Sequence, residues 1–323
     1  MRFALIPCLA AIAASLLLAS GASAQTVKIT PLGSHAGEFC RFDRALVLED
    51  PNGTRLLYDV GRTVRGAEDA RLGSIDAVLL SHVHGDHLGD RHQSGPEAGS
   101  CGDPDVSVVD APTSGTVLIT VAKNAKLLVG GEMASFFMKK VTKAGGEATQ
   151  VQLVRFGGER DVNGVTVYGV PAVHSNGLSP EFLEGAHAHA LEESGLTAYL
   201  GPPGGFVVEF TNGLTVYLSG DTGHTAEQDA VVRRRFGAEL AVMNIGGVFT
   251  TGPTEAAFVI NELVQPAAVI ASHANEEATA GGQVKPGTKT ASFIAATKVP
   301  VHLPLSDRTM EFDSGGNCVG GCS

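Results

Sequence analysis

The chain has 323 residues, of which 43% are hydrophobic and 18% charged, a composition that excludes a disordered or fibrous protein. With 23 basic and 34 acidic residues the net charge is −11, which argues against nucleic acid as a partner because phosphate binding needs a basic surface. Tryptophan is absent and aromatic residues make up only 6%, so the core must be largely aliphatic.

The first 24 residues have the pattern of a secretory signal peptide. Arg2 supplies a positive charge, an apolar run covers residues 4–18, and residues 22–24 (Ala-Ser-Ala) form a small-residue cleavage motif. The apolar run is too short to span a bilayer comfortably. We therefore expect a signal peptide over residues 1–24 and a single mature domain over residues 25–323. The mature protein is expected to be secreted or periplasmic, with no membrane association.

Four cysteines remain after this cleavage, namely Cys40, Cys101, Cys318 and Cys322. An even number of cysteines in an exported protein predicts disulfides, and four cysteines allow three pairings. The glycines between Cys318 and Cys322 would let that pair close on itself, leaving Cys40 with Cys101. A zinc site is the alternative use of these thiols, but no Cys-x-x-Cys pair supports it.

The predicted elements alternate short strands with turns. In the first half the predicted strands are 27–31, a hairpin of 44–49 and 54–59 around an Asp-Pro-Asn-Gly turn, and the apolar run 75–81. A loop rich in glycine and proline follows at 91–114, and a helix at 131–144. In the second half the predicted strands are 151–156, 165–170, 204–210, 214–219, 239–244, 267–272, 300–305 and 308–312, with helices at 179–195 and 254–264.

Segments in the two halves of the chain resemble each other. Residues 75–82 (IDAVLLSH) resemble residues 266–273 (PAAVIASH), and residues 56–59 (LLYD) resemble residues 216–221 (VYLSGD). Each half thus has a strand that ends in an aspartate and a later strand that ends in Ser-His. The repetition indicates a duplicated β-sheet unit with functional side chains at its strand ends, where loops build sites.

A cluster of polar residues follows the buried strand that ends at residue 81. His82 and His84 are spaced to point the same way from an extended chain, and Asp86 and His87 enter the following turn. Imidazole and carboxylate groups are common ligands of Zn²⁺ and similar metals. Four buried polar groups without such a ligand would lack partners, so the cluster predicts a metal site.

Three further polar residues, His174, Asp221 and His273, each end an apolar strand. The whole pattern resembles the metallo-β-lactamase superfamily of metallohydrolases over about residues 27–312. This resemblance implies an α/β fold, a four-layer αββα sandwich, with a dimetal site at one edge. It implies that one metal is held by His82, His84 and His174, that a second is held by Asp86, His87 and His273, and that Asp221 bridges both. The expected cofactors are two divalent ions, with zinc first and manganese or iron as alternatives.

Asp221 distinguishes the chain from true β-lactamases, which usually have Cys or His at that position. With an aspartate at this position, the chain resembles instead the larger group of lactonases, thioesterases and phosphodiesterases. Within that group, residues 169–175, 243–247 and 250–255 are similar to the ascorbate-6-phosphate lactonase-like branch. The resemblance implies a dinuclear hydrolase in which a metal-bridging hydroxide attacks an ester or lactone-type small molecule. Asp86 is the expected catalytic residue, because it would both bind a metal and orient the hydroxide.

Alternatives remain open for the function. A phosphodiesterase or a β-lactamase-like activity would use the same fold, and a non-catalytic metal-binding protein would need the same ligands. Few basic residues lie near the ligands in the sequence, which disfavours a highly charged phosphate substrate. Asp59 is the first candidate to hold a ligand histidine by its free N–H group, and Asp90 is the second. His224, three residues after Asp221, is a candidate for contact with substrate.

Overall fold

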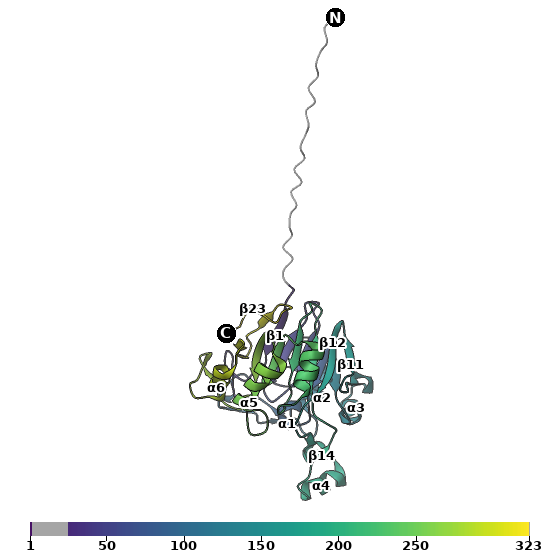
Figure 1. Ribbon diagram of the computed structural model, residues 1–323. Helices are drawn as coiled ribbons and strands as arrows, with labels where there is room; N and C mark the ends of the chain where they lie inside the picture. Colours follow the sequence, from purple (N-terminus) through teal and green to yellow (C-terminus); the bar gives the residue numbers. More distant parts are fainter. Residues whose placement is uncertain (2–24, 323) are drawn as a thin grey trace.

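The computed structural model describes Met1 and residues 25–322, so the predicted signal peptide lies, apart from Met1, outside the described residues. Two large β-sheets pack face to face, and helices cover the outer face of each sheet (Figure 1). This is the predicted αββα sandwich.

The first sheet contains strands from both ends of the chain. Its order is β10-β9-β4-β3-β2-β1-β22-β23. The bounds are β1 Val27–Pro31, β2 Leu46–Glu49, β3 Arg55–Tyr58, β4 Ala77–Leu80, β9 Lys126–Val129, β10 Val151–Leu153, β22 Met310–Phe312 and β23 Cys318–Gly320. Strands β2 and β3 form the predicted hairpin, and β3, β4, β9 and β10 run parallel to one another.

The second sheet is built from the second half of the chain, in the order β11-β12-β15-β16-β17-β18-β21. The bounds are β11 Glu159–Val162, β12 Val165–Pro171, β15 Gly204–Glu209, β16 Thr215–Leu218, β17 Leu240–Asn244, β18 Ala268–Ser272 and β21 Val301–His302. Strands β16, β17, β18 and β21 are parallel. Of the segments that resemble each other, β3 and β4 lie in the first sheet and β16 and β18 in the second.

Three apolar clusters hold these layers together. One lies between the sheets and combines side chains such as Leu56 of β3 with Val216 of β16. The neighbouring Leu57 points to the opposite face, where α2 (Gly115–Ala122) and α3 (Met133–Lys143) cover the first sheet. The second sheet is covered by η3 (Gln228–Phe236), α5 (Pro253–Phe258), η4 (Val259–Val264) and α6 (Lys289–Ala296). Strands buried on both faces explain the continuous apolar runs of the sequence.

Some predicted elements differ from the structure. The single helix predicted at 179–195 is wrong, because the 3₁₀ turn Pro180–Phe182 and helix α4 (Gly185–Glu193) are separate elements. Phe182 is buried, and Gly185 has a left-handed φ of 74°, which breaks the helix between them. Helix α2 was not predicted, since its sequence GTVLITVA is apolar without a helical period.

Smaller elements surround the edge of the sandwich. The predicted loop 91–114 contains two short antiparallel pairs, β5 (Arg91–His92) with β8 (Val108–Val109) and β6 (Gly99–Ser100) with β7 (Asp103–Pro104). Strands β13 (Gly177–Leu178) and β14 (Ala198–Tyr199) pair next to α4, which projects from the body in Figure 1. Strands β19 (Thr279–Ala280) and β20 (Gln283–Val284) form a last pair.

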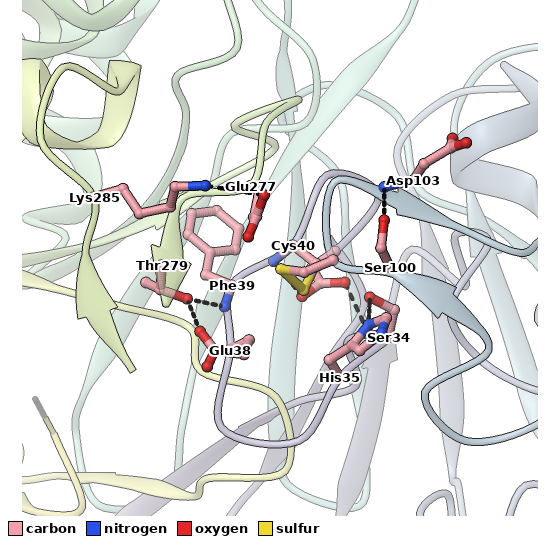
Figure 2. Close-up of a disulfide and its surroundings, with 12 residues drawn as sticks. Ser34, His35, Glu38, Phe39, Cys40, Ser100, Asp103, Glu277, Thr279 and Lys285 are labelled. Atoms are coloured by element: carbon pink, nitrogen blue, oxygen red, sulfur yellow. Dashed lines mark hydrogen bonds and ion pairs between the residues drawn. A yellow bond between two sulfur atoms is a disulfide. The ribbon is translucent and has the colours of Figure 1, made fainter. Parts of the chain in front are cut away.

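The four cysteines form two disulfides, Cys40–Cys101 and Cys318–Cys322. Figure 2 shows the first of these beside Phe39, whose backbone N–H donates to Thr279 Oγ1 (2.8 Å). The disulfide and this bond attach the loop after β1 both to the 99–105 segment and to β19. Within the described residues, no helix is long and apolar enough to cross a membrane.

Candidate metal centre

The candidate site lies where the carboxyl ends of strands from both sheets meet. His82 and His84 follow β4, and the short helix α1 (Gly85–Leu88) then carries Asp86 and His87. His174, Asp221 and His273 follow β12, β16 and β18 of the second sheet. The two sheets are joined at this edge by a hydrogen bond from Gly204 N to Ser81 O (3.1 Å).

All seven predicted ligand residues converge at this edge. His84 Nδ1 lies 3.0 Å from His82 Nε2 and 3.1 Å from His174 Nε2. On the other side, His273 Nε2 lies 3.5 Å from Asp86 Oδ2. The ligand-type atoms of His82, His84 and His174 lie within 4.8 Å of one another, and so do those of Asp86, His87 and His273. These are the same two triads that the resemblance implies.

Asp221 connects the two triads. Its Oδ2 atom lies 3.3 Å from His273 Nε2, 3.4 Å from His87 Nε2 and 3.7 Å from His174 Nε2. Because His174 belongs to one triad and the other two histidines to the second, a single carboxylate faces both. This is the placement that a carboxylate bridging two cations requires.

Several buried atoms of the centre lack a protein partner. His87 Nε2, Asp221 Oδ1 and both ring nitrogens of His273 find no hydrogen-bond partner among the described residues, although their surroundings exclude solvent. A buried polar atom without a partner lowers folding stability, and imidazole nitrogens and carboxylate oxygens are common ligands of divalent metals. The donor set therefore fits divalent metal ions, with one triad of three imidazoles and one of two imidazoles and a carboxylate.

The electrostatics of the centre favour positive charge between its carboxylates. Burial lowers the pKa of His82 well below its usual value, and burial together with His174 lowers the pKa of His84 to about 4. Both imidazoles are therefore neutral at pH 7, the form that binds metal. Burial also opposes a charge on His87, but Asp221 and Asp59 outweigh it and raise the pKa of His87 to about 10.

The carboxylate of Asp221 is ionised in spite of its burial. Burial disfavours its charge, but the imidazoles of His273 and His87 outweigh burial and hold the pKa of Asp221 well below its usual range. Arg44 and His87 act in the same way on Asp86, whose pKa is also held well below its usual range against burial. Both carboxylates can therefore act as anionic ligands.

Asp59 supports one histidine of each triad. Its Oδ2 accepts a hydrogen bond from His87 Nδ1 (2.8 Å) and from Ser81 Oγ (2.8 Å). Ser81 Oγ in turn lies 3.0 Å from His82 Nδ1. These contacts leave Nε2 of both rings directed toward the centre. The structure thus places Asp59 where the sequence prediction put it, directly behind the ligand histidines.

We expect the Asp59→Asn variant to bind metal about 10–100-fold more weakly, the loss typical of a removed partner of a ligating histidine. The amide keeps the size of the side chain but is a weaker hydrogen-bond acceptor than a carboxylate for His87 Nδ1–H. Competition with a chromophoric chelator would measure the affinity, with the exposed Glu68→Gln variant as a control for charge alone. An unchanged affinity would contradict the supporting role of Asp59.

The turn that carries Asp221 depends on a glycine and a tyrosine. Gly220 has a left-handed φ of 60°, and a Cβ atom there would lie 2.5 Å from Gly204 O, so a larger residue does not fit. The Gly220 N–H donates to the hydroxyl of buried Tyr58 (2.8 Å). Tyr58 therefore fixes the turn before Asp221, a role that sequence reasoning missed.

Arg44 is a second residue that sequence reasoning missed. Its side chain is 2% exposed, and Nη1 donates to Asp86 Oδ2 (2.7 Å) while Nη2 donates to Asn275 Oδ1 (3.1 Å). Arg44 thereby connects the turn that carries Asp86 to the turn after His273. The only signal in the sequence is a charged residue at the start of the predicted strand 44–49.

A cavity of about 630 Å³ opens onto the candidate metal centre. Its lining includes the predicted ligands His84, Asp86, His174, Asp221 and His273. It also includes four basic residues from three separate parts of the chain, Arg41, Arg44, Arg62 and Lys289. The expectation that few basic residues lie near the ligands is therefore wrong, because folding brings together cations that are far apart in the sequence.

Two further candidate residues lie away from the ligands. Asp90 accepts a hydrogen bond from Arg62 Nε (2.7 Å), so this buried carboxylate holds an arginine of the cavity and not a ligand histidine. His224 is exposed, lies with its ring 6.2 Å from that of Phe258, and is absent from the lining of the cavity. The tertiary structure separates it from the centre although Asp221 is only three residues away.

Comparison with known proteins agrees with this geometry. A family model described as "Beta-lactamase superfamily domain" matches residues 43–273, well over half of the chain. A "UPF0173 metal-dependent hydrolase" from Thermodesulfovibrio yellowstonii is 28% identical over 235 residues, which cover 70% of this chain and 73% of the relative.

Solved structures with low sequence identity share the fold. A metallo hydrolase from the archaeon Ignicoccus hospitalis aligns with a TM-score of 0.58 at 20% identity, covering 89% of this chain and 99% of that one. A metallo-β-lactamase fold protein from Bacillus subtilis aligns with a TM-score of 0.52 at 14% identity, with the same coverage. The chain belongs to the metallo-β-lactamase superfamily and is a metal-dependent hydrolase.

Proposed function

We propose that this protein is an exported hydrolase that binds two divalent metal ions, with zinc as the expected metal, and cleaves an ester or lactone bond in a small molecule. One observation carries the proposal: the Oδ2 atom of Asp221 faces histidines of both triads, at 3.3–3.7 Å. Two triads that share a carboxylate provide for two neighbouring cations, as in two-metal hydrolytic sites.

When bound, such a metal pair supplies Lewis acidity and an acidified water as the nucleophile. The chain's own residues would then position the substrate and the charge. His82, His84 and His174 would hold one ion, Asp86, His87 and His273 the other, and Asp221 both. Asp86 lies at the cavity surface, partly exposed, so its carboxylate would also be able to accept a hydrogen bond from the attacking water. A serine or cysteine nucleophile is not required.

Export is supported by the signal-peptide pattern of residues 1–24 and by the two disulfides, which persist in oxidising compartments. We infer a secreted or periplasmic location for the mature protein. Fractionation of cells that express the full chain would test this inference. Recovery of the uncleaved chain from the cytoplasm would contradict it.

Proton release by the mature protein tests the activity. The panel holds γ-butyrolactone, a longer-chain γ-lactone, a carboxylic ester, a phosphodiester and a β-lactam, each with and without EDTA. We expect chelator-sensitive proton release on the lactones or the ester, and about two metal ions per chain by elemental analysis. One ion per chain in a fully active protein would contradict the dinuclear site.

A phosphodiester is the second candidate substrate, because the cavity holds four basic residues. Chelator-sensitive cleavage of the phosphodiester alone would assign the protein to that activity. No activity on any member of the panel, with two metals bound, would mean either that the substrate lies outside the panel or that the chain is a non-catalytic metal-binding protein.

A further inference from the structure

The cavity differs from the rest of the chain in its charge. Four of the sixteen residues that line it are Arg or Lys, against 23 of 323 in a chain with a net charge of −11. The only carboxylates in this lining are Asp86 and Asp221, which belong to the candidate metal centre. With divalent metals bound the cavity would be strongly cationic. Such a cavity concentrates anions from solution.

Two of these cations flank one aromatic ring. The guanidinium carbons of Arg41 and Arg62 lie 5.2 Å and 5.9 Å from the centroid of the Phe42 ring. Arg62 is held in place by Asp90 through Nε and Nη2, and its Nη1 has no hydrogen bond to the described residues. Both arginines line the same cavity, and the planar fork of a guanidinium group matches the geometry of a carboxylate or phosphate group.

Arg41 is available to bind a ligand. Its nearest carboxylate is Asp103 at 3.7 Å, and both side chains are exposed, at 48% and 84%. An exposed ion pair of this length contributes little, so an incoming anion can replace Asp103 without a large loss. A third cation, Lys289, donates from Nζ to Gly246 O (2.7 Å) and has no salt bridge within the described part of the chain.

The loop that carries Arg41 and Phe42 is fixed from both sides. The disulfide Cys40–Cys101 precedes Arg41 directly, and Asp43 accepts hydrogen bonds from Cys40 N (2.8 Å) and Ser34 N (2.9 Å). Figure 2 shows this segment between the 100–103 turn and β19. A loop held in this way loses little conformational freedom when a ligand binds, which favours affinity.

The cavity also has an apolar rim. Val248 and Phe249, in the loop between β17 and α5, are 95% and 74% exposed although both line the cavity. Val248 has a left-handed φ of 60°, which is strained for a β-branched residue. Strained backbone that holds apolar side chains in solvent is a pattern found at ligand sites.

We propose that the substrate of this hydrolase is an anionic amphiphile, whose anionic group binds to the guanidinium groups of Arg41 and Arg62 beside Phe42 and whose apolar part is covered by Val248 and Phe249. The assignment of the bond that is cleaved rests on the proposed function. The binding of the anion does not rest on it, because none of these five residues is a predicted metal ligand.

Calorimetric binding of octanoate, octyl phosphate and neutral octan-1-ol tests the proposal. The full mature chain is measured with its metals and again after EDTA treatment, with near-ultraviolet circular dichroism to check folding. We expect both anions to bind in either state and octan-1-ol to bind at least about tenfold more weakly, the loss of one charge-assisted hydrogen bond. The tighter of the two anions identifies the anionic group as carboxylate or phosphate.

Variants separate the parts of the site. Arg41→Ala is expected to weaken the binding of both anions about tenfold, because it removes one charge-assisted contact. The binding of octan-1-ol should not change. Phe249→Ala is expected to weaken the binding of all three ligands. Arg160→Ala, on exposed β11 outside the cavity lining, is the matched control and should change nothing.

Anions that bind only in the presence of metal, with an affinity that Arg41→Ala does not alter, would overturn the anion site while leaving the hydrolase proposal intact. Anions that bind as expected to a protein without chelator-sensitive hydrolysis would support the site and contradict the hydrolysis instead. If the metal-free chain unfolds, the comparison of Arg41→Ala with the parent chain in the metal-loaded state decides, since Arg41 contacts no predicted ligand.

Discussion

Replacement of Asp221 by Asn is expected to reduce hydrolysis by at least about 10³-fold, since a catalytic metal supplies several kcal/mol of transition-state stabilisation and each ~1.4 kcal/mol is tenfold in rate. The Oδ2 atom of Asp221 faces His87, His174 and His273 at 3.3–3.7 Å. A neutral amide cannot balance two cations at that position. Bound metal should therefore fall below two ions per chain.

Turnover and elemental analysis on the same preparation check this prediction, with the melting temperature as a test of folding. Asp105→Asn, at an exposed position outside the cavity lining, serves as the control that changes the same charge. Full turnover with two metals bound in Asp221→Asn would mean that the carboxylate does not bridge.

Asp86→Asn is expected to lower turnover by about 10²–10³-fold, in the range of a lost catalytic acid–base or orienting group, while part of the metal is retained. His87 and His273 would still contact the second ion, but the anionic oxygen beside the reacting water would be lost. Buried Arg44 would also face a neutral partner, which removes a charged hydrogen bond of about 1.5–3 kcal/mol from folding stability.

This variant also distinguishes an enzyme from a metal-binding protein. In an enzyme, the substitution reduces turnover by a much larger factor than it reduces the amount of bound metal. A protein that only binds metal has no turnover and shows only a modest change in metal affinity. Denaturant unfolding of Asp86→Asn beside Asp105→Asn would measure the stability cost. An Asp86→Asn enzyme with full turnover would remove the catalytic role assigned to Asp86.

Local patterns in the sequence predicted the main strands and the candidate ligand residues, and the family resemblance that these residues carry implied the sandwich. The strands are short apolar runs, and a strand buried on both faces needs such a run wherever it lies in the fold. The ligand residues from His82 to His87 sit within six positions and directly follow such a strand, so backbone geometry alone brings them together. His174, Asp221 and His273 each end a strand, and strand ends of packed sheets share an edge.

The role of Arg44, the position of His224 and the existence of helix α2 depend on tertiary contacts, which leave no local pattern in the sequence. Arg44 looks like an ordinary charge before a strand until folding buries it against Asp86 and Asn275. His224 is close to Asp221 in sequence, yet it is exposed beside Phe258 outside the cavity. Helix α2 is held by burial against the first sheet and not by an amphipathic pattern.

The sequence by itself predicted the fold and the family, which the structure and the comparisons confirm, and it named the seven residues that the structure brings together as candidate metal ligands. Each of these depends on residues that are neighbours in the chain or that end a strand. Only the tertiary structure decided the character of the cavity. Arg41 and Arg62 lie in loops and Lys289 begins helix α6, so the three are far apart in the chain, yet tertiary packing brings all of them to the lining of one cavity. The charge of a cavity depends on which side chains lie next to one another in space, and tertiary contacts set that arrangement.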